Sequence, residues 1–176
     1  MLTTMTSWRY SRQPQVVELT VKVGVIKDDV ELDSTLKALA RQAAGKGCGA
    51  LVMFMGFVKG VVEGSAVKEL VYEAHESYAL GKLREIGEWA VKEFGVEDVV
   101  ILHRVGALRP GDPTIYVIVT AATRSKAFEA AAQVLERVKH EAPIYKLEVR
   151  EDGEYWVIGD GRRLRRGNVE GGGAEA

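Results

Sequence analysis

The sequence predicts a single α+β domain with three main helices and a mixed or antiparallel sheet. Two observations support this prediction. Hydrophobic patterns indicate the order strand, helix, two strands, helix, two strands, helix and hairpin, which is typical of an α+β domain. The chain has 176 residues, of which 47% are hydrophobic, and this is enough for one sizeable core and too little for a second full domain.

The domain is expected over residues 15–158, with a flexible tail at each end. Residues 1–14 are polar and show no periodicity. Residues 159–176 contain a basic stretch and a Gly-rich end. Such segments carry too little apolar surface to pack against a core.

The first half of the domain predicts a strand, a helix and two more strands. Alternating apolar residues make the first strand half-buried, and continuous apolar runs indicate that the next two are buried. Asp33 or Ser34 can cap the helix between them, and Gly45 ends it. A Gly-containing loop over residues 59–65 joins the second and third strands. The strands are expected over residues 17–25, 50–58 and 67–74.

The second half predicts two helices and four strands. An apolar stripe over residues 77–94 indicates a helix that ends at Gly95. The third helix covers residues 125–140 and ends before Pro143. The dipeptide at residues 152–153, Asp-Gly, is a favoured hairpin turn between the last two strands. The strands are expected over residues 98–104, 114–121, 144–150 and 154–158.

Composition excludes several classes of function. The 24 basic residues nearly cancel the 25 acidic ones, so the chain has no overall charge that would favour nucleic acid or an anionic membrane. No secretory signal and no apolar run of the ~18 residues that a membrane span needs is present, which favours the cytoplasm. Cys48 is the one cysteine, and no zinc-like spacing or Gly-rich nucleotide motif occurs. The sequence therefore predicts neither a metal nor a bound cofactor.

Lys139 is the first candidate for a chemical role. At about 100° per residue, it falls within a helical stripe of mostly apolar residues that includes Phe128 and Leu135, so it is expected to point inward. Partial desolvation in a cleft would lower its pKa and make it useful for proton transfer. The alternative is a lysine that extends past the edge of the core near a helix C-terminus.

Lys146 is the second candidate, because Pro143 can turn its strand back toward the end of the helix that carries Lys139. Alternation along this strand places Lys146 and Glu148 on the same face. Paired lysines would suit a phosphorylated substrate. A surface ion pair between Lys146 and Glu148 is the alternative explanation.

Other basic residues stand where segments begin or end. Arg124 follows Thr123 at the start of the third helix, where backbone N–H groups favour anions. His103 and Arg104 end a strand and are candidates either for substrate contact or for structural hydrogen bonds. Lys59 begins a loop that can close over an anion, although a solvated lysine is the alternative. A basic run near the C-terminus contains Arg162, Arg163, Arg165 and Arg166.

Together these residues resemble the large-subunit family of molybdopterin synthase, known as the MoaE family, over residues 16–158. The most specific similarity lies at the start of the third helix and across its end. The matching segments are residues 124–130 (RSKAFEA), Lys139 with residues 142–148 (APIYKLE), residues 103–106 (HRVG), residues 110–112 (PGD) and residues 54–56 (FMG).

The resemblance implies an α/β-hammerhead-like fold and a homodimer that binds a small ubiquitin-like subunit at each end. It further implies that the small subunit's Gly-Gly thiocarboxylate supplies sulfur, in two transfers, to cyclic pyranopterin monophosphate, which becomes molybdopterin. Lys139 and Lys146 match the family's active-site lysines, and Arg124 matches an anion-binding arginine. Thr123 stands where many relatives carry His, and Lys59 where many carry Arg.

Two further expectations concern basic residues. Arg162 or Arg163 is expected to replace the family's arginine that reaches the neighbouring subunit. Lys139 is expected to be less hydrated than Lys146 and therefore to move the proton, while Lys146 binds an anion. The rival functions are a non-catalytic module that docks the tail of a ubiquitin-like partner and, against the charge balance, a nucleic-acid binder.

Overall fold

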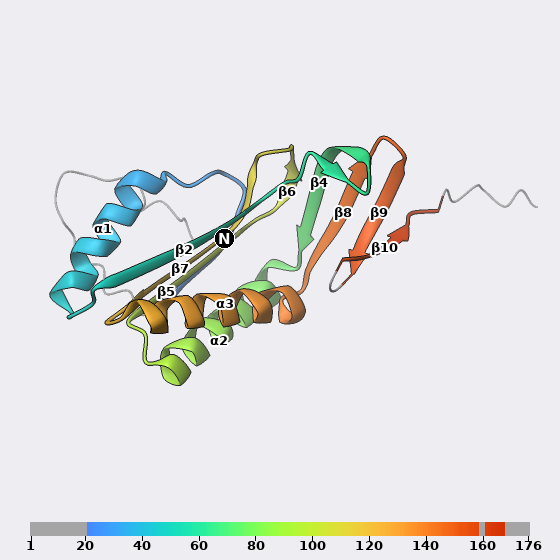
Figure 1. Cartoon of the computed structure of the whole chain (residues 1–176). Helices are drawn as coiled ribbons and strands as arrows, with labels where there is room; N and C mark the ends of the chain where they lie inside the picture. Colours follow the sequence, from blue (N-terminus) through green and yellow to red (C-terminus); the bar gives the residue numbers. More distant parts are fainter. Residues whose placement is uncertain (1–20, 159–160, 168–176) are drawn as a thin grey trace, which may run out of the picture.

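The computed structural model describes residues 21–158 and 161–167, and its strands form two sheets (Figure 1). The first is four-stranded in the order β1-β5-β7-β2, with β1 parallel to β5 and the other pairs antiparallel. Its strands are β1 (Val21–Ile26), β5 (Asp98–Arg104), β7 (Pro113–Ala121) and β2 (Ala50–Phe57). This sheet is therefore mixed, as the sequence predicts.

Helices cover both faces of the first sheet. Figure 1 shows α1 (Leu32–Gly45) on one side and α2 (Glu76–Phe94) with α3 (Arg124–Glu141) on the other. Alternate residues of β5 supply the two cores: Val99 and Ile101 pack with residues of α2 and α3, whereas Val100 and Leu102 pack with Leu39 of α1. Burial on both faces explains why β5 and β7 are almost continuously apolar.

The second sheet is antiparallel and lies beyond one end of the first (Figure 1). Its order is β10-β9-β8-β4-β3, and β6 also pairs with β4. The strands are β3 (Val61–Val62), β4 (Ser65–Ala74), β6 (Gly106–Leu108), β8 (Ile144–Arg150), β9 (Gly153–Ile158) and β10 (Arg162–Arg165). Because α2 starts just after β4 and α3 ends just before β8, the two long helices are tied directly to this sheet.

The α+β class with three helices in the described residues is confirmed, but three local expectations are wrong. The segment at residues 59–65 is not only a loop, because it contains β3 in a hairpin with β4. Residues 162–165 lie within the expected tail, yet they form β10 along the free edge of β9. The cap of α1 is Glu31, whose carboxylate accepts a hydrogen bond from the backbone N–H of Ser34 at 3.1 Å. The expected tail at residues 1–14 lies outside the described residues.

The helices of the described residues were compared with the requirements of a membrane span. None of the helices found there combines the length and the apolar character that a membrane span requires.

Gly95 is a position where the fold depends on glycine. It ends α2 in the left-handed region, with φ of 59°, and its N–H donates to the carbonyl of Val91. Replacing it with alanine adds a Cβ that this conformation disfavours, so Gly95→Ala should lower the free energy of unfolding by about 1 kcal/mol. Chemical denaturation measures this difference.

Gly45→Ala is the matched control, because Gly45 also lies at a helix end but a Cβ there has nothing within 4 Å and the conformation is not left-handed. This variant should be as stable as the original protein or more stable. Equal destabilisation by both variants would contradict the explanation.

Candidate functional site

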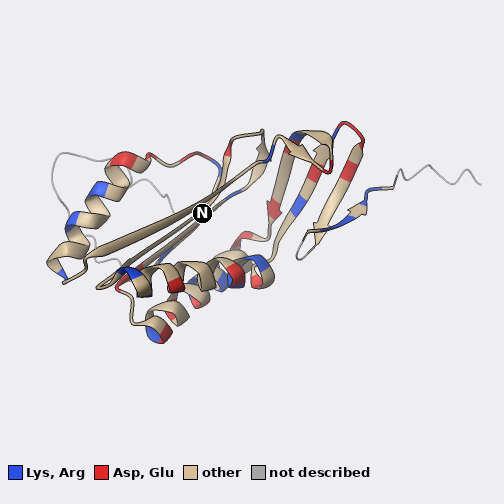
Figure 2. Ribbon diagram, in the orientation of Figure 1, with Lys and Arg blue, Asp and Glu red and all other residues tan. Residues whose placement is uncertain are grey.

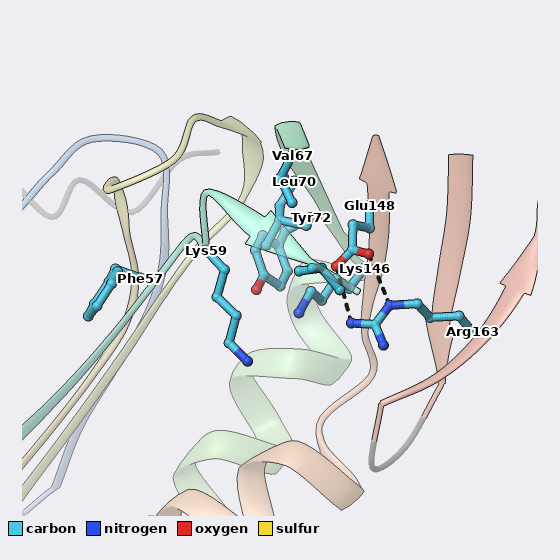
Figure 3. Close-up of a pocket in the computed structure, with 9 residues that line it drawn as sticks. Phe57, Lys59, Val67, Leu70, Tyr72, Lys146, Glu148 and Arg163 are labelled. Carbon is cyan, nitrogen blue, oxygen red and sulfur yellow. Dashed lines mark hydrogen bonds and ion pairs between the residues drawn. The ribbon is translucent and has the colours of Figure 1, made fainter. Parts of the chain in front are cut away.

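A small pocket opens in the second sheet, where strands far apart in the sequence meet (Figure 3). Apolar side chains form one part of its wall, and three cations and one carboxylate form the rest. The lining residues are Phe57, Lys59, Val62, Val67, Leu70, Tyr72, Lys146, Glu148 and Arg163. Its volume of about 90 Å³ is well below the ~300 Å³ of a typical small-molecule site. The pocket therefore suits a small acidic group or a chain end.

The register of β4 against β8 builds the centre of the pocket. Tyr72 lies opposite Lys146, and Leu70 lies opposite Glu148. Residues two apart on a strand share a face, so Lys146 and Glu148 project together toward the pocket. Figure 3 shows both side chains beside the ring of Tyr72.

Lys146 is partly withdrawn from water. Desolvation is the main cause that lowers the pKa of its ammonium group below the usual value. Three neighbouring cations lower the pKa further, and Glu148 opposes them. These cations are Arg163, Lys59 and Lys139. Lys146 can therefore lose its proton more readily than an ordinary lysine.

Glu148 is the buried charge of the site, with only 2% of its surface exposed. Its Oε1 accepts a hydrogen bond from Nε of Arg163 at 2.9 Å, and it lies 3.6 Å from the guanidinium of Arg150. Burial of a carboxylate requires such partners. The alternative of a surface ion pair between Lys146 and Glu148 is therefore wrong.

Lys139 does not point inward. It is 55% exposed and its ammonium lies 3.5 Å from Glu136 on the same helix. The error lies in the phase of α3, because Phe128, which helped to define the expected stripe, is itself exposed. The residues that α3 buries are Ala127, Ala130, Ala131, Val134 and Val138. Lys139 does not line the pocket, although its charge is close enough to lower the pKa of Lys146.

Thr123 and Arg124 lie at the far end of α3 from Lys139. Fifteen residues at 1.5 Å each separate Arg124 from Lys139 by roughly 22 Å along the helix. Both Thr123 and Arg124 are exposed, and neither lines the pocket. Their expected role in binding a substrate stays a prediction, and within one chain it lies apart from this pocket.

His103 and Arg104 also lie outside the pocket lining. The edge of the His103 ring packs against Tyr72, with 5.0 Å between ring centroids, and its Nδ1–H donates to the carbonyl of Arg104 at 2.8 Å. Arg104 donates to the backbone carbonyls of Pro113 and Lys27. Arg104 therefore ties strand ends together, and His103 supports the ring of Tyr72 from behind.

Arg163 lines the pocket, whereas Arg162 does not. Because neighbouring residues of a strand point to opposite faces, β10 directs Arg162 to solvent when Arg163 meets Glu148. Lys59 lies in the wall of the pocket, and its expected contact with an anion stays a prediction (Figure 3). Phe57 and Tyr72 were not singled out from the sequence, and only the strand register that pairs Tyr72 with Lys146 would have indicated the latter.

The charged side chains of the site do not form a metal centre. Among the described residues, no group of three His, Cys, Asp or Glu side chains could hold a metal ion. Cations dominate the pocket itself, and Glu148 already binds arginine. The arrangement fits an anionic ligand.

The burial of His103 makes stability depend on pH. Desolvation, the largest cause, lowers its pKa from 6.5 to about 4. Between these values the unfolded chain binds the proton and the folded chain does not, so stability falls as pH falls. The loss should approach about 1.4 kcal/mol per pH unit. Denaturant unfolding of the original protein and of His103→Gln between pH 7 and 4.5 isolates this contribution, and equal slopes would contradict it.

Comparisons with known proteins agree with this fold. The profile of the MoaE protein family matches residues 25–141. The chain is 34% identical over 141 residues to the molybdopterin synthase catalytic subunit of Pyrococcus abyssi, covering 79% of this chain and 93% of that protein.

Two solved structures are also similar. The molybdopterin synthase structure from Staphylococcus aureus superposes with a TM-score of 0.63 at 28% identity, covering 77% of this chain and 94% of that one. A Helicobacter pylori complex of subunits 1 and 2 of molybdopterin-converting factor contains a chain with a TM-score of 0.59 at 21% identity, covering 87% and 92%, which shows a shared fold. The family match and the identity to the Pyrococcus abyssi protein together show that this chain belongs to the MoaE family.

Proposed function

We propose that this chain is the catalytic subunit of a molybdopterin synthase and acts as a sulfurtransferase in molybdenum cofactor biosynthesis. It takes sulfur from the C-terminal Gly-Gly thiocarboxylate of a small ubiquitin-like subunit and transfers it to cyclic pyranopterin monophosphate, in the cytoplasm. The observation that carries the proposal is the convergence of Lys59, Lys146 and Arg163 on a small pocket. Its relatives' activity supports the assignment.

The chemistry of the two reactants fits this pocket. A thiocarboxylate and a phosphate are both anions, and the pocket offers three cations for one buried carboxylate. Its small volume suits the narrow end of a chain. A partner bound to a structural relative, as in the Helicobacter pylori complex, supports the pairing with a small subunit.

The roles of the lysines are the reverse of those expected from the sequence. Lys146 has the lowered pKa, so we assign it the proton transfer at the reacting group. Lys59 and Arg163 hold the anion. Lys139, exposed at the end of α3, contributes positive potential. Arg124 and Thr123 lie too far from the pocket of their own chain to contribute to it. We assign them to the pocket of the second chain of a homodimer.

The rival function is a module that binds the partner's tail without catalysis. Thr123 and Lys59, which replace a histidine and an arginine common among relatives, are the features that favour it. A desolvated lysine is costly and unnecessary for docking alone, and this favours catalysis.

One assay separates the two functions. The chain is mixed with a thiocarboxylated small subunit and cyclic pyranopterin monophosphate, and dithiolene formation is measured. Product is expected only when all three components are present. Tight binding of the small subunit without product would support the docking module.

A pair of conservative substitutions tests the lysine roles. Lys146→Arg keeps a cation but cannot lose its proton near neutral pH, so kcat should fall by about 10²-fold or more. Lys139→Arg preserves the charge that this position supplies and should retain activity within a few-fold. Binding of the small subunit should persist in both variants. Full activity of Lys146→Arg would remove Lys146 from the proton-transfer role.

We also predict that the chain forms a homodimer. Several large apolar side chains are exposed on α2, α3 and β8, including Tyr78, Phe128 and Tyr145, and pairing would cover such surface. Sedimentation at micromolar concentration should give twice the mass of one chain. A monomer under these conditions would contradict the prediction.

A further inference from the structure

The carboxylate of Glu63 lies at the tip of the β3–β4 hairpin and contacts two arginines that surround Glu148. Its Oε2 is 3.0 Å from Nη1 of Arg150, and its Oε1 is 3.5 Å from Nη1 of Arg163. Arg163 in turn bonds Glu148, as Figure 3 shows. Glu63 does not line the pocket, so it reaches the site only through these guanidinium groups.

Arg150 forms the buried centre of this network. It is 5% exposed, and the face of its guanidinium stacks on the ring of Tyr155 at 4.0 Å from the centroid. It also donates to the carboxylate of Asp152 at 2.9 Å and to the carbonyl of Val62. The hydrogen bond that Arg150 donates to Glu63 is the largest cause that raises the pKa of Arg150. Arg150 is therefore fixed, and it anchors the hairpin tip to β8.

The backbone at Glu63 is unfavourable for glutamate. Val62 pairs with Ser65, so residues 63 and 64 form a two-residue turn, and both have left-handed φ angles of 52° and 81°. Such turns favour Asn-Gly, and a residue like Glu costs roughly 1 kcal/mol there. Among the described non-glycine residues, Glu63 alone has a positive φ. The strain suggests that the side chain of Glu63 has a role that offsets this cost. Asparagine would suit the turn better, but its shorter and uncharged side chain would not form these ion pairs.

The charge balance shows what that contribution is. Among the described residues, Glu148 is the one carboxylate that lines the pocket. It is shared between Arg163 and Arg150 and also faces Lys146. Glu63 supplies a second negative charge to the same two arginines. Without Glu63, the charges of both guanidinium groups would be balanced mainly by Glu148. The positive potential around Lys146 would then rise.

We propose that Glu63 is a positioning residue of this site, which fixes Arg163 and Arg150 around Glu148 and thereby sets the charge balance at Lys146. The inference about catalysis rests on the proposed sulfur transfer, whereas the electrostatic part does not. The charged or titratable groups that affect Lys146 or stand beside it are Glu148, Arg163, Lys59, Lys139, Tyr72 and His103. Glu63 adds a carboxylate to this set from outside the pocket.

The test combines two substitutions with one control, all in the full chain. Glu63→Gln keeps the length of the side chain and removes its charge. Glu63→Asn removes the charge and shortens the side chain. Because asparagine favours the left-handed turn, this variant is expected to keep the fold. Glu154→Gln is the control, because Glu154 is a half-buried carboxylate of the same sheet that forms its ion pair with Arg166.

The first measurement is the titration of Lys146 by NMR of ¹³C-labelled lysine, with its signal assigned by loss in Lys146→Gln. Removal of the negative charge that Glu63 places on Arg150 and Arg163 leaves more positive potential around Lys146 and disfavours its ammonium form, so the titration midpoint should move to lower pH in both Glu63 variants. The midpoint should not move in Glu154→Gln. This readout needs no turnover, so it decides the electrostatic proposal even if the chain proves not to transfer sulfur.

The second measurement is kcat/KM for dithiolene formation. Displacement of Arg163 should lower it by about tenfold in both Glu63 variants, with less than a twofold change in Glu154→Gln. An unchanged or raised midpoint for Lys146 in folded Glu63→Gln and Glu63→Asn would overturn the proposal. Unfolding of both variants would also overturn it, because Glu63 would then hold the fold instead of the site. A shifted midpoint with unchanged kcat/KM in an active enzyme would refute the catalytic part.

Discussion

The burial of Glu148 is the constraint on which the second sheet and its pocket depend. A carboxylate with 2% of its surface exposed is tolerable only with cationic partners, and these come from β8 itself and from β10. Arg163 can reach Glu148 because β10 pairs antiparallel with β9 and places this side chain on the face of the sheet that carries Glu148. The short basic strand is thus held both by backbone pairing and by this ion pair, and it closes one wall of the pocket.

The first sheet and its helices determine where this pocket forms. The two-sided core around β5 and β7 fixes the ends of α2 and α3, and these helices connect directly to β4 and β8. Antiparallel pairing of β4 with β8 then places Tyr72 beside Lys146. As Figure 2 shows, acidic and basic residues are interspersed over the ribbon, so the excess of cations at the pocket is local and not a property of the whole chain.

The packing gives two lysines of this region different electrostatic environments and therefore different roles. Lys146 and Lys139 have the same side chain, but one is desolvated among cations and the other extends into water beside Glu136. Desolvation and the neighbouring cations lower the pKa of Lys146. Glu63 extends the same principle, because a solvent-exposed carboxylate acts on the pocket through arginines that are partly or fully buried.

The sequence by itself determined the α+β class, the positions of the three helices and most strands, because hydrophobic periodicity and glycine or proline boundaries are local signals. It also indicated Lys59, Lys146 and Glu148, since motif spacing and strand alternation identify them. Only the tertiary structure decided that Lys139 is exposed, because a small error in helix phase moves a side chain out of the core. It also decided that Arg163 and not Arg162 meets the pocket, and that Arg124 lies far along α3. A basic run gives no local signal for strand formation. β10 forms because the free edge of β9 and the buried carboxylate of Glu148 provide its partners.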